Sequence, residues 1–142
     1  MTNKRVLWID SDSSTTESYR DKLIDNKLSI EVVDNAYDAV LKLDTVYDAV
    51  FLNPFLNQGR RRSDLPDGSS DPYRFGLWTY EKILKSCNAN KPIFLLYIGG
   101  RISHGREKLS ELEKARKSTK LFCLLDDSIH NLEQIIKTKL KL

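Results

Sequence analysis

The chain alternates short apolar runs with longer segments in which apolar residues recur at helical spacing. This alternation is typical of βαβ units built around a parallel sheet. We expect strands over residues 5–9, 30–34, 49–53, 93–98 and 121–125. Four of these runs are almost continuously apolar, as strands covered on both faces should be, whereas the second alternates and is expected nearer a sheet edge.

Helical spacing of apolar residues predicts a helix after each strand. Ser14 and Glu17 have the spacing of a capping box, which predicts the start of the first helix, and Asn35 is the expected N-cap of the second. The other helices are expected over residues 76–87, over residues 106–116 and from residue 128 onward. The predicted fold class is therefore α/β, a doubly wound (βα)5 sandwich of three layers with a central five-stranded parallel sheet.

The length of 142 residues suits one domain, spanning residues 1–142. A long polar loop over residues 57–75 separates the third strand from the third helix. Connections in such folds usually have about two to six residues, and longer ones tend to be functional or unstructured. Both interpretations of this loop, an unstructured surface segment or a binding element, stay open at this point.

Charge is distributed unevenly along the chain. Residues 1–56 carry 6 Lys and Arg against 10 Asp and Glu (net −4), whereas residues 57–142 carry 17 against 10 (net +7). The aromatic interleaving of a dedicated nucleic-acid binder is missing, so nucleic acid is not the expected partner. No apolar run approaches the roughly 20 residues that cross a bilayer, and the two cysteines suggest no disulfide framework. We expect a cytoplasmic protein without a membrane partner.

Polar residues follow the predicted strands where each strand ends. Asp10, Ser11 and Asp12 follow the first strand, Asn53 closes the third, and Tyr97 lies near the end of the fourth. In open α/β sheets, ligands bind outside the carboxyl ends of the strands. These residues therefore define the expected functional edge.

At this edge the chain resembles the receiver domains of two-component response regulators, over nearly its whole length. The resemblance is carried by Val-Leu-Trp-Ile-Asp at residues 6–10, by residues 30–39, by Tyr-Asp-Ala-Val-Phe-Leu-Asn-Pro at residues 47–54, by Gly-Leu at 76–77 and by Lys-Pro-Ile-Phe-Leu-Leu at 91–96. The resemblance implies a CheY-like, flavodoxin-like sheet with strand order 2-1-3-4-5. It also implies a role in signal transduction.

The chain departs from the family pattern at the phosphorylation site. The resemblance implies paired acids after the first strand that hold Mg²⁺ and a phosphoacceptor aspartate after the third. Here Asp10 matches the first acid, Ser11 stands in place of the second, Asp12 comes one residue later, and Asn53 occupies the phosphoacceptor position. A neutral, delocalised carboxamide should not form an acyl phosphate, so we expect no phosphorylation at Asn53. Mg²⁺ binding by Asp10 and Asp12 should be absent or weak.

The positions that the family uses for switching also differ. By resemblance, a Ser or Thr after the fourth strand, an aromatic residue on the fifth and a Lys after the fifth respond to the phosphoryl group. Tyr97, Phe122 and Leu125 occupy these places, and Lys120 lies at the wrong end of the strand to replace the lost Lys. Because two bulky rings cannot easily exchange places, we expect a state fixed by packing.

These departures predict a phosphorylation-independent pseudo-receiver that acts through protein contacts and has no catalytic residues and no required cofactor. The resemblance implies a protein partner such as a histidine kinase or another regulator, or self-association through the fourth helix, fifth strand and fifth helix. Arg60, Arg61, Arg62 and Arg74, in and beside the long loop, form a candidate partner-binding element.

Two alternatives remain. Asp10 and Asp12 also resemble the Asp-x-Asp motif of haloacid-dehalogenase-like, Mg²⁺-dependent phosphatases, with Asp126 and Asp127 as a late acidic pair, although Tyr97 replaces the expected Ser or Thr. The second alternative is a regulator that binds nucleic acid.

In that alternative, Arg60, Arg61 and Arg62 contact phosphates, which would give a steep salt dependence. Acidic residues in the same loop dilute this basic charge.

Overall fold

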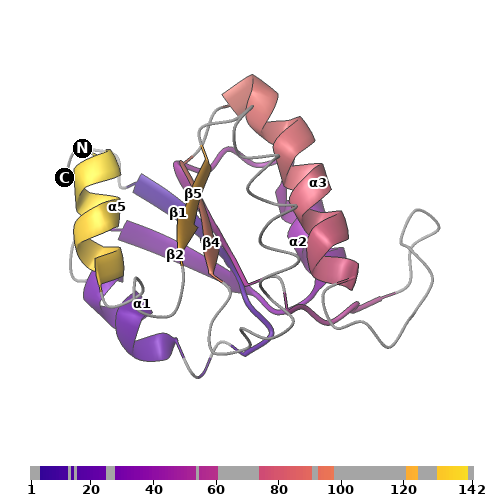
Figure 1. The fold of residues 1–142 in the computed structure, drawn as a ribbon, viewed down its shortest axis with the longest axis horizontal. Helices are drawn as coiled ribbons and strands as arrows, with labels where there is room; N and C mark the ends of the chain where they lie inside the picture. Colours follow the sequence, from indigo (N-terminus) through magenta and orange to yellow (C-terminus); the bar gives the residue numbers. More distant parts are fainter. Residues whose placement is uncertain are drawn as a thin grey trace.

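The computed structural model of the chain describes residues 4–12, 14, 16–24, 28–53, 55–60, 74–90, 93–97, 121–124 and 131–140. They contain a five-stranded parallel sheet with the order β2-β1-β3-β4-β5 (Figure 1). The strands are β1 (Lys4–Ile9), β2 (Leu28–Val33), β3 (Ala49–Leu52), β4 (Ile93–Tyr97) and β5 (Leu121–Leu124). The predicted strand order and the edge position of β2 are confirmed.

Helices cover both faces of this sheet. They are α1 (Glu17–Ile24), α2 (Ala36–Lys42), α3 (Arg74–Asn90) and α5 (Leu132–Leu140). Figure 1 shows α1 and α5 on one side of the sheet and α2 and α3 on the other, which gives the predicted three layers. The helix expected over residues 106–116 lies outside the described residues.

The helix starts differ from the predictions. Helix α1 begins at Glu17, so Glu17 is not the third residue of a helix capped by Ser14. The residue directly before α1 is Thr16, whose hydroxyl donates to a buried carboxylate at the end of β1. Asn35 is the N-cap of α2, as predicted, and its side chain accepts from the Asp38 N–H. Helix α3 begins two residues earlier than expected, at Arg74. Helix α5 is described from Leu132, and the expected start at residue 128 lies outside the described residues.

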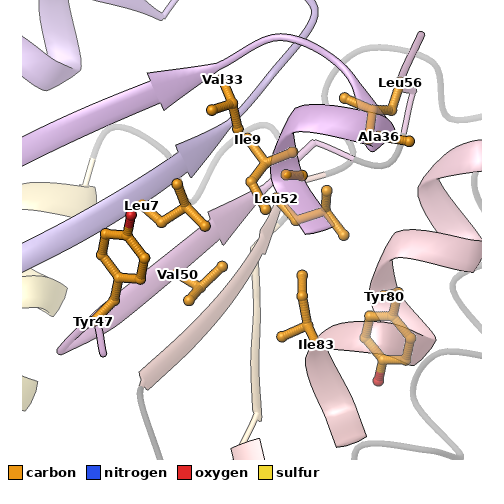
Figure 2. Packing of buried hydrophobic residues seen from close by; sticks show 11 residues of the cluster. Leu7, Ile9, Val33, Ala36, Tyr47, Val50, Leu52, Leu56, Tyr80 and Ile83 are labelled. Carbon is orange, nitrogen blue, oxygen red and sulfur yellow. The ribbon is translucent and has the colours of Figure 1, made fainter. Parts of the chain in front are cut away.

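Alternating strand residues supply two separate cores. Leu7 and Ile9 of β1 pack toward α2 and α3, in a cluster that also contains Val50, Leu52 and Ile83 (Figure 2). The intervening residues of β1 and β3 face α1 and α5. There the rings of Trp8 and Phe51 stack with centroids 3.7 Å apart and an interplanar angle of 11°.

The first residues after β3 dock onto the N-terminus of α2. The carbonyls of Asn57 and Gln58 accept from the N–H groups of Ala36 and Tyr37, at 2.9 and 3.1 Å. Gly59 has φ +78°, and a Cβ there would lie 2.2 Å from the Asn35 Oδ1. These contacts satisfy amides that a helix N-terminus leaves free. The predicted 57–75 loop is therefore shorter than expected at both ends. Its first residues are bound to α2, and Arg74 and Phe75 belong to α3. Residues 61–73 lie outside the described residues.

A polar network links β1, β2 and α2 with the loop that precedes β3. The Glu31 carboxylate accepts from the Tyr47 hydroxyl at 2.7 Å and contacts the Lys42 Nζ at 2.6 Å, with an Arg5 Nη2 at 3.9 Å. The Lys42 and Tyr47 hydrogen bonds lower the pKa of Glu31. Burial, followed by the hydrogen bond to Glu31 and the charge of that carboxylate, raises the pKa of Tyr47 to about 12.

This network predicts a loss of stability in alkaline solution. Because Tyr47 releases its proton at higher pH in the folded state than its ordinary value of about 10, the stabilisation is present below pH 10 and is lost as pH rises toward 12. Urea unfolding measured between about pH 9 and about pH 11.5 should show a steeper loss for the natural chain than for Tyr47→Phe. Equal slopes for the two proteins would contradict the prediction.

Candidate functional site

The register of β1 and β3 brings together two of the predicted site residues. Trp8 of β1 and Phe51 of β3 are paired in register. Asp10 and Asn53 follow these residues by two positions, just beyond the strand ends, so their side chains lie on the same face of the sheet as the two rings. The Asn53 Nδ2 lies 3.2 Å from the Asp10 Oδ1. Asp10 is fully buried and Asn53 is 4% exposed. The carboxylate and the amide therefore form a contact pair above the stacked rings.

Within the described part of the chain, four donors form hydrogen bonds to the carboxylate of Asp10. Its Oδ1 accepts from the Asp12 N–H at 2.9 Å and from Asn53. Its Oδ2 accepts from the Thr16 hydroxyl at 2.8 Å and, at the longer distance of 3.4 Å, from the indole Nε1–H of Trp8. A carboxylate offers about four lone-pair positions, so these donors occupy the acceptor capacity of the group.

The amide of Asn53 is held in one orientation. Its Nδ2 donates to Asp10, and its Oδ1 accepts from the Phe55 N–H at 3.1 Å. A flipped amide would set its oxygen against the carboxylate oxygen and its NH₂ group against the Phe55 N–H, and both arrangements are repulsive. An aspartate in this position could not donate to Asp10. Asn53, which stands where the receiver pattern has an aspartate, therefore forms a hydrogen bond to Asp10 that the aspartate could not form.

Ser11, at the predicted position of the second acid, ties loops together. Its hydroxyl donates to the Asp34 carbonyl at 2.7 Å and accepts from the Asn57 N–H at 2.8 Å. It thereby joins the ends of β1 and β2 to the segment after β3. The side chain of Asp12 is exposed, and only its backbone N–H contacts Asp10. Of the expected remnant acidic pocket, the described part of the chain therefore supplies one buried carboxylate, that of Asp10.

Two residues of this site, Thr16 and Arg20, were not predicted from the sequence. Thr16 is 3% exposed, and its hydroxyl both donates to Asp10 and accepts from the Arg20 Nη1 at 2.8 Å. The Arg20 guanidinium also lies over the Trp8 ring, 5.4 Å from its centroid. Their spacing of four residues at the start of a helix could have indicated this contact, because side chains four residues apart lie on the same helix face and this helix follows the acidic edge.

The other predicted site residues are placed in part. By strand register, Tyr97 pairs with Leu124 and Leu95 with Phe122, so the two switch positions lie on adjacent strands. Arg60 and Arg74 are exposed, and Arg74 opens α3. Five predicted site residues lie outside the described residues: Arg61, Arg62, Leu125, Asp126 and Asp127.

The described residues do not fit a Mg²⁺ site at this edge. Both Asp10 oxygens accept hydrogen bonds from the protein, the Asn53 NH₂ group faces the carboxylate, and Ser11 is bound to the loops. Hard divalent cations require several oxygen ligands directed at one point. Across the described part of the chain, no group of three or more His, Cys, Asp or Glu side chains could hold a metal ion. No helix in that part is long and apolar enough to span a bilayer.

Comparison with solved structures identifies the fold. The chain is similar to a signal receiver domain from Vibrio parahaemolyticus (TM-score 0.65, 17% identity, 99% of this chain and 92% of that chain). It is also similar to a two-component response regulator from Clostridium difficile (0.64, 18%, 98% and 97%) and to a response regulator receiver domain from Francisella (0.60, 18%, 98% and 98%).

The chain therefore has the CheY-like fold of response regulator receiver domains, as its sequence predicted. No family model matches the sequence, and no curated protein matches it.

We predict that Asn53→Asp destabilises the protein. The change replaces a donor with a second carboxylate 3.2 Å from the Asp10 Oδ1, and a buried charged group deprived of its partner costs about 2 kcal/mol or more. Urea unfolding should show this loss, and Mg²⁺ should restore part of it in the variant only. Gln134→Glu, an equal change from amide to carboxylate at an exposed position of α5, is the control. Stability equal to that of the natural chain would contradict the prediction.

We also predict that Ser11→Ala loosens the segment after β3. The change leaves the Asn57 N–H and the Asp34 carbonyl without their shared partner, at a cost of about 1–3 kcal/mol. Amide hydrogen exchange at Asn57 should accelerate, whereas Ser11→Thr, which keeps the hydroxyl, should retain most of the protection. Unchanged exchange in Ser11→Ala would show that the bridge contributes nothing.

Proposed function

We propose that this protein is a pseudo-receiver, a phosphorylation-independent module that acts in signal transduction through protein contacts. The fold supports the signalling class, because the similar structures include receiver domains of response regulators. The independence from phosphorylation rests on the site.

One observation carries the proposal: the Asn53 amide is fixed between the Asp10 carboxylate and the Phe55 N–H. The residue at the phosphoacceptor position is a neutral carboxamide whose oxygen already accepts a hydrogen bond. It offers no anionic oxygen for attack on phosphorus. The side chain therefore has a structural role at the place where a receiver would perform phosphoryl transfer.

The proposal includes no cofactor. Mg²⁺ would have to displace donors from Asp10, and Ser11 and the exposed Asp12 do not complete a ligand set around it. The same saturation of Asp10 argues against the phosphatase alternative, since a nucleophilic carboxylate needs an oxygen free to reach phosphorus. We propose no enzymatic activity.

The partner is a protein, either a histidine kinase or another regulator, or a second copy of the chain. The expected contact surface is the fourth helix, β5 and α5. Leu132 and Ile136 of α5 are buried against the sheet, while Glu133 and Lys137 form an ion pair of 3.2 Å on its more exposed side. The exposed side chains of Arg60 and Arg74 offer a second contact surface, which is basic and suits an acidic protein partner. We expect the protein to work in the cytoplasm.

The test adds Mg²⁺ and then acetyl phosphate to the labelled protein while amide NMR signals and phosphate release are followed. We expect unchanged signals at Asp10, Asp12 and Asn53, no phosphoryl adduct by mass spectrometry and no phosphate release. Asn53→Asp, which restores the carboxylate, is the positive control and should show Mg²⁺-dependent shifts.

A phosphoryl adduct on the natural chain would overturn phosphorylation independence. Steady phosphate release with shifts at Asp10 and Asp12 would instead favour the phosphatase.

A further inference from the structure

Asp10 is a buried acidic side chain without a fitting metal site. It is fully buried above the Trp8–Phe51 stack, and a desolvated charge is costly unless it is hydrogen-bonded and paired. Among the described residues, the four groups that donate to it are all neutral. A positive charge close to the carboxylate would therefore stabilise the site most.

Arg20 is placed to supply this charge. Its Nη1 donates to the Thr16 hydroxyl at 2.8 Å, and the same hydroxyl donates to the Asp10 Oδ2 at 2.8 Å. A threonine hydroxyl can accept and donate at the same time, so it transmits the polarisation from guanidinium to carboxylate. Two hydrogen bonds separate the positive group from the negative one.

The Trp8 ring holds the guanidinium from a second direction. Arg20 lies over its face, 5.4 Å from the centroid, and the indole N–H of the same ring is directed at the Asp10 Oδ2. Cation–π attraction and hydrogen bonding thus close a ring of contacts through Arg20, Thr16, Asp10 and Trp8. An arginine suits this role because it stays charged and stacks on aromatic faces.

We propose that Arg20, bridged by Thr16, is the resident cation of Asp10 and acts together with the hydrogen bonds on this carboxylate to keep divalent cations out of the pocket. The proposal deepens the proposed function, on which it rests, because it explains how the site works without Mg²⁺. The protein replaces a dissociable ion with a side chain that is always present. The charge at this edge is therefore independent of the Mg²⁺ concentration.

The test uses Mn²⁺ as a paramagnetic probe of the pocket in the complete, ¹⁵N-labelled chain. The indole N–H signal of Trp8 reports binding at Asp10, because this N–H is directed at the carboxylate. Trp78→Phe assigns the two indole signals, since the chain has 2 tryptophans. In the natural protein we expect the Trp8 signal to persist as Mn²⁺ is added.

In Arg20→Met, which keeps an apolar stem over the ring and removes the charge, the Trp8 signal should broaden at a Mn²⁺ concentration at least about tenfold lower. Arg20→Lys should stay close to the natural protein. Lys22→Met, an equal loss of charge on the same helix, is the matched control and should leave the signal unchanged.

Broadening at the same Mn²⁺ concentration in the natural protein and in Arg20→Met would overturn the proposal, as would a signal that persists in both. If Arg20→Met unfolds, Arg20→Gln, which keeps an N–H donor for the Thr16 hydroxyl and removes the charge, takes its place in the same titration. Broadening of the Trp8 signal in Arg20→Gln at the Mn²⁺ concentration of the natural protein would assign Arg20 a packing role and overturn the proposal.

These outcomes are separate from the test of phosphorylation. A phosphoryl adduct on the natural chain would refute the proposed function without changing the Mn²⁺ result. A failure of the Mn²⁺ prediction would leave the neutral Asn53 site in place.

Discussion

The buried carboxylate of Asp10 is the constraint around which this edge of the sheet is organised. It lies directly above the stacked rings of Trp8 and Phe51, where little water is available to solvate it. Burial of a charged group is tolerated only when the protein replaces the lost hydration. The donors come from the loop after β1, the start of α1 and the end of β3, so this one side chain fixes three parts of the backbone relative to one another.

The departures from the receiver pattern are consistent with one another when charge is considered. In the receiver pattern, the positions of Asp10, Ser11 and Asn53 all hold acids. Three carboxylates close together repel one another unless a cation lies between them. With Ser11 and Asn53 in two of those positions, Asp10 keeps the one carboxylate among these three residues, and the protein's own donors can satisfy it. The Ser11 hydroxyl donates to the Asp34 carbonyl. An ionised acid at this position has no hydrogen to donate and could not form this bond.

The sequence predicted the sheet and part of the site. Long apolar runs and the alternation in β2 predicted the strands and the edge, because burial on one or both faces leaves a direct pattern. Asp10 and Asn53 were expected at the same edge because both lie at the carboxyl ends of strands, whereas their direct hydrogen bond was not predicted. Thr16 and Arg20 were missed because a hydroxyl before a helix has the same pattern whether it caps that helix or donates elsewhere.

The role of Ser11 could not be predicted for a different reason. It depends on Asn57, which is 46 residues away and is held by its docking on the N-terminus of α2. Hydrophobic periodicity reports how each segment is buried and contains no information about which loop meets which helix end. The long polar loop therefore gave two open interpretations, and only the contacts of Asn57 and Gln58 distinguish them for its first residues.

The fixed site also limits how such a module can transmit a signal. A ligand or modification shifts a conformational equilibrium only by as much as it interacts differently with the two states. On the proposed function, no phosphoryl group forms at Asn53 and no divalent ion enters at Asp10, so neither can supply this difference. The Ser11 bridge and the α2 contacts further oppose movement of the segment after β3. Regulation must then come from the partner, through its concentration or its own state, while this protein presents a constant surface.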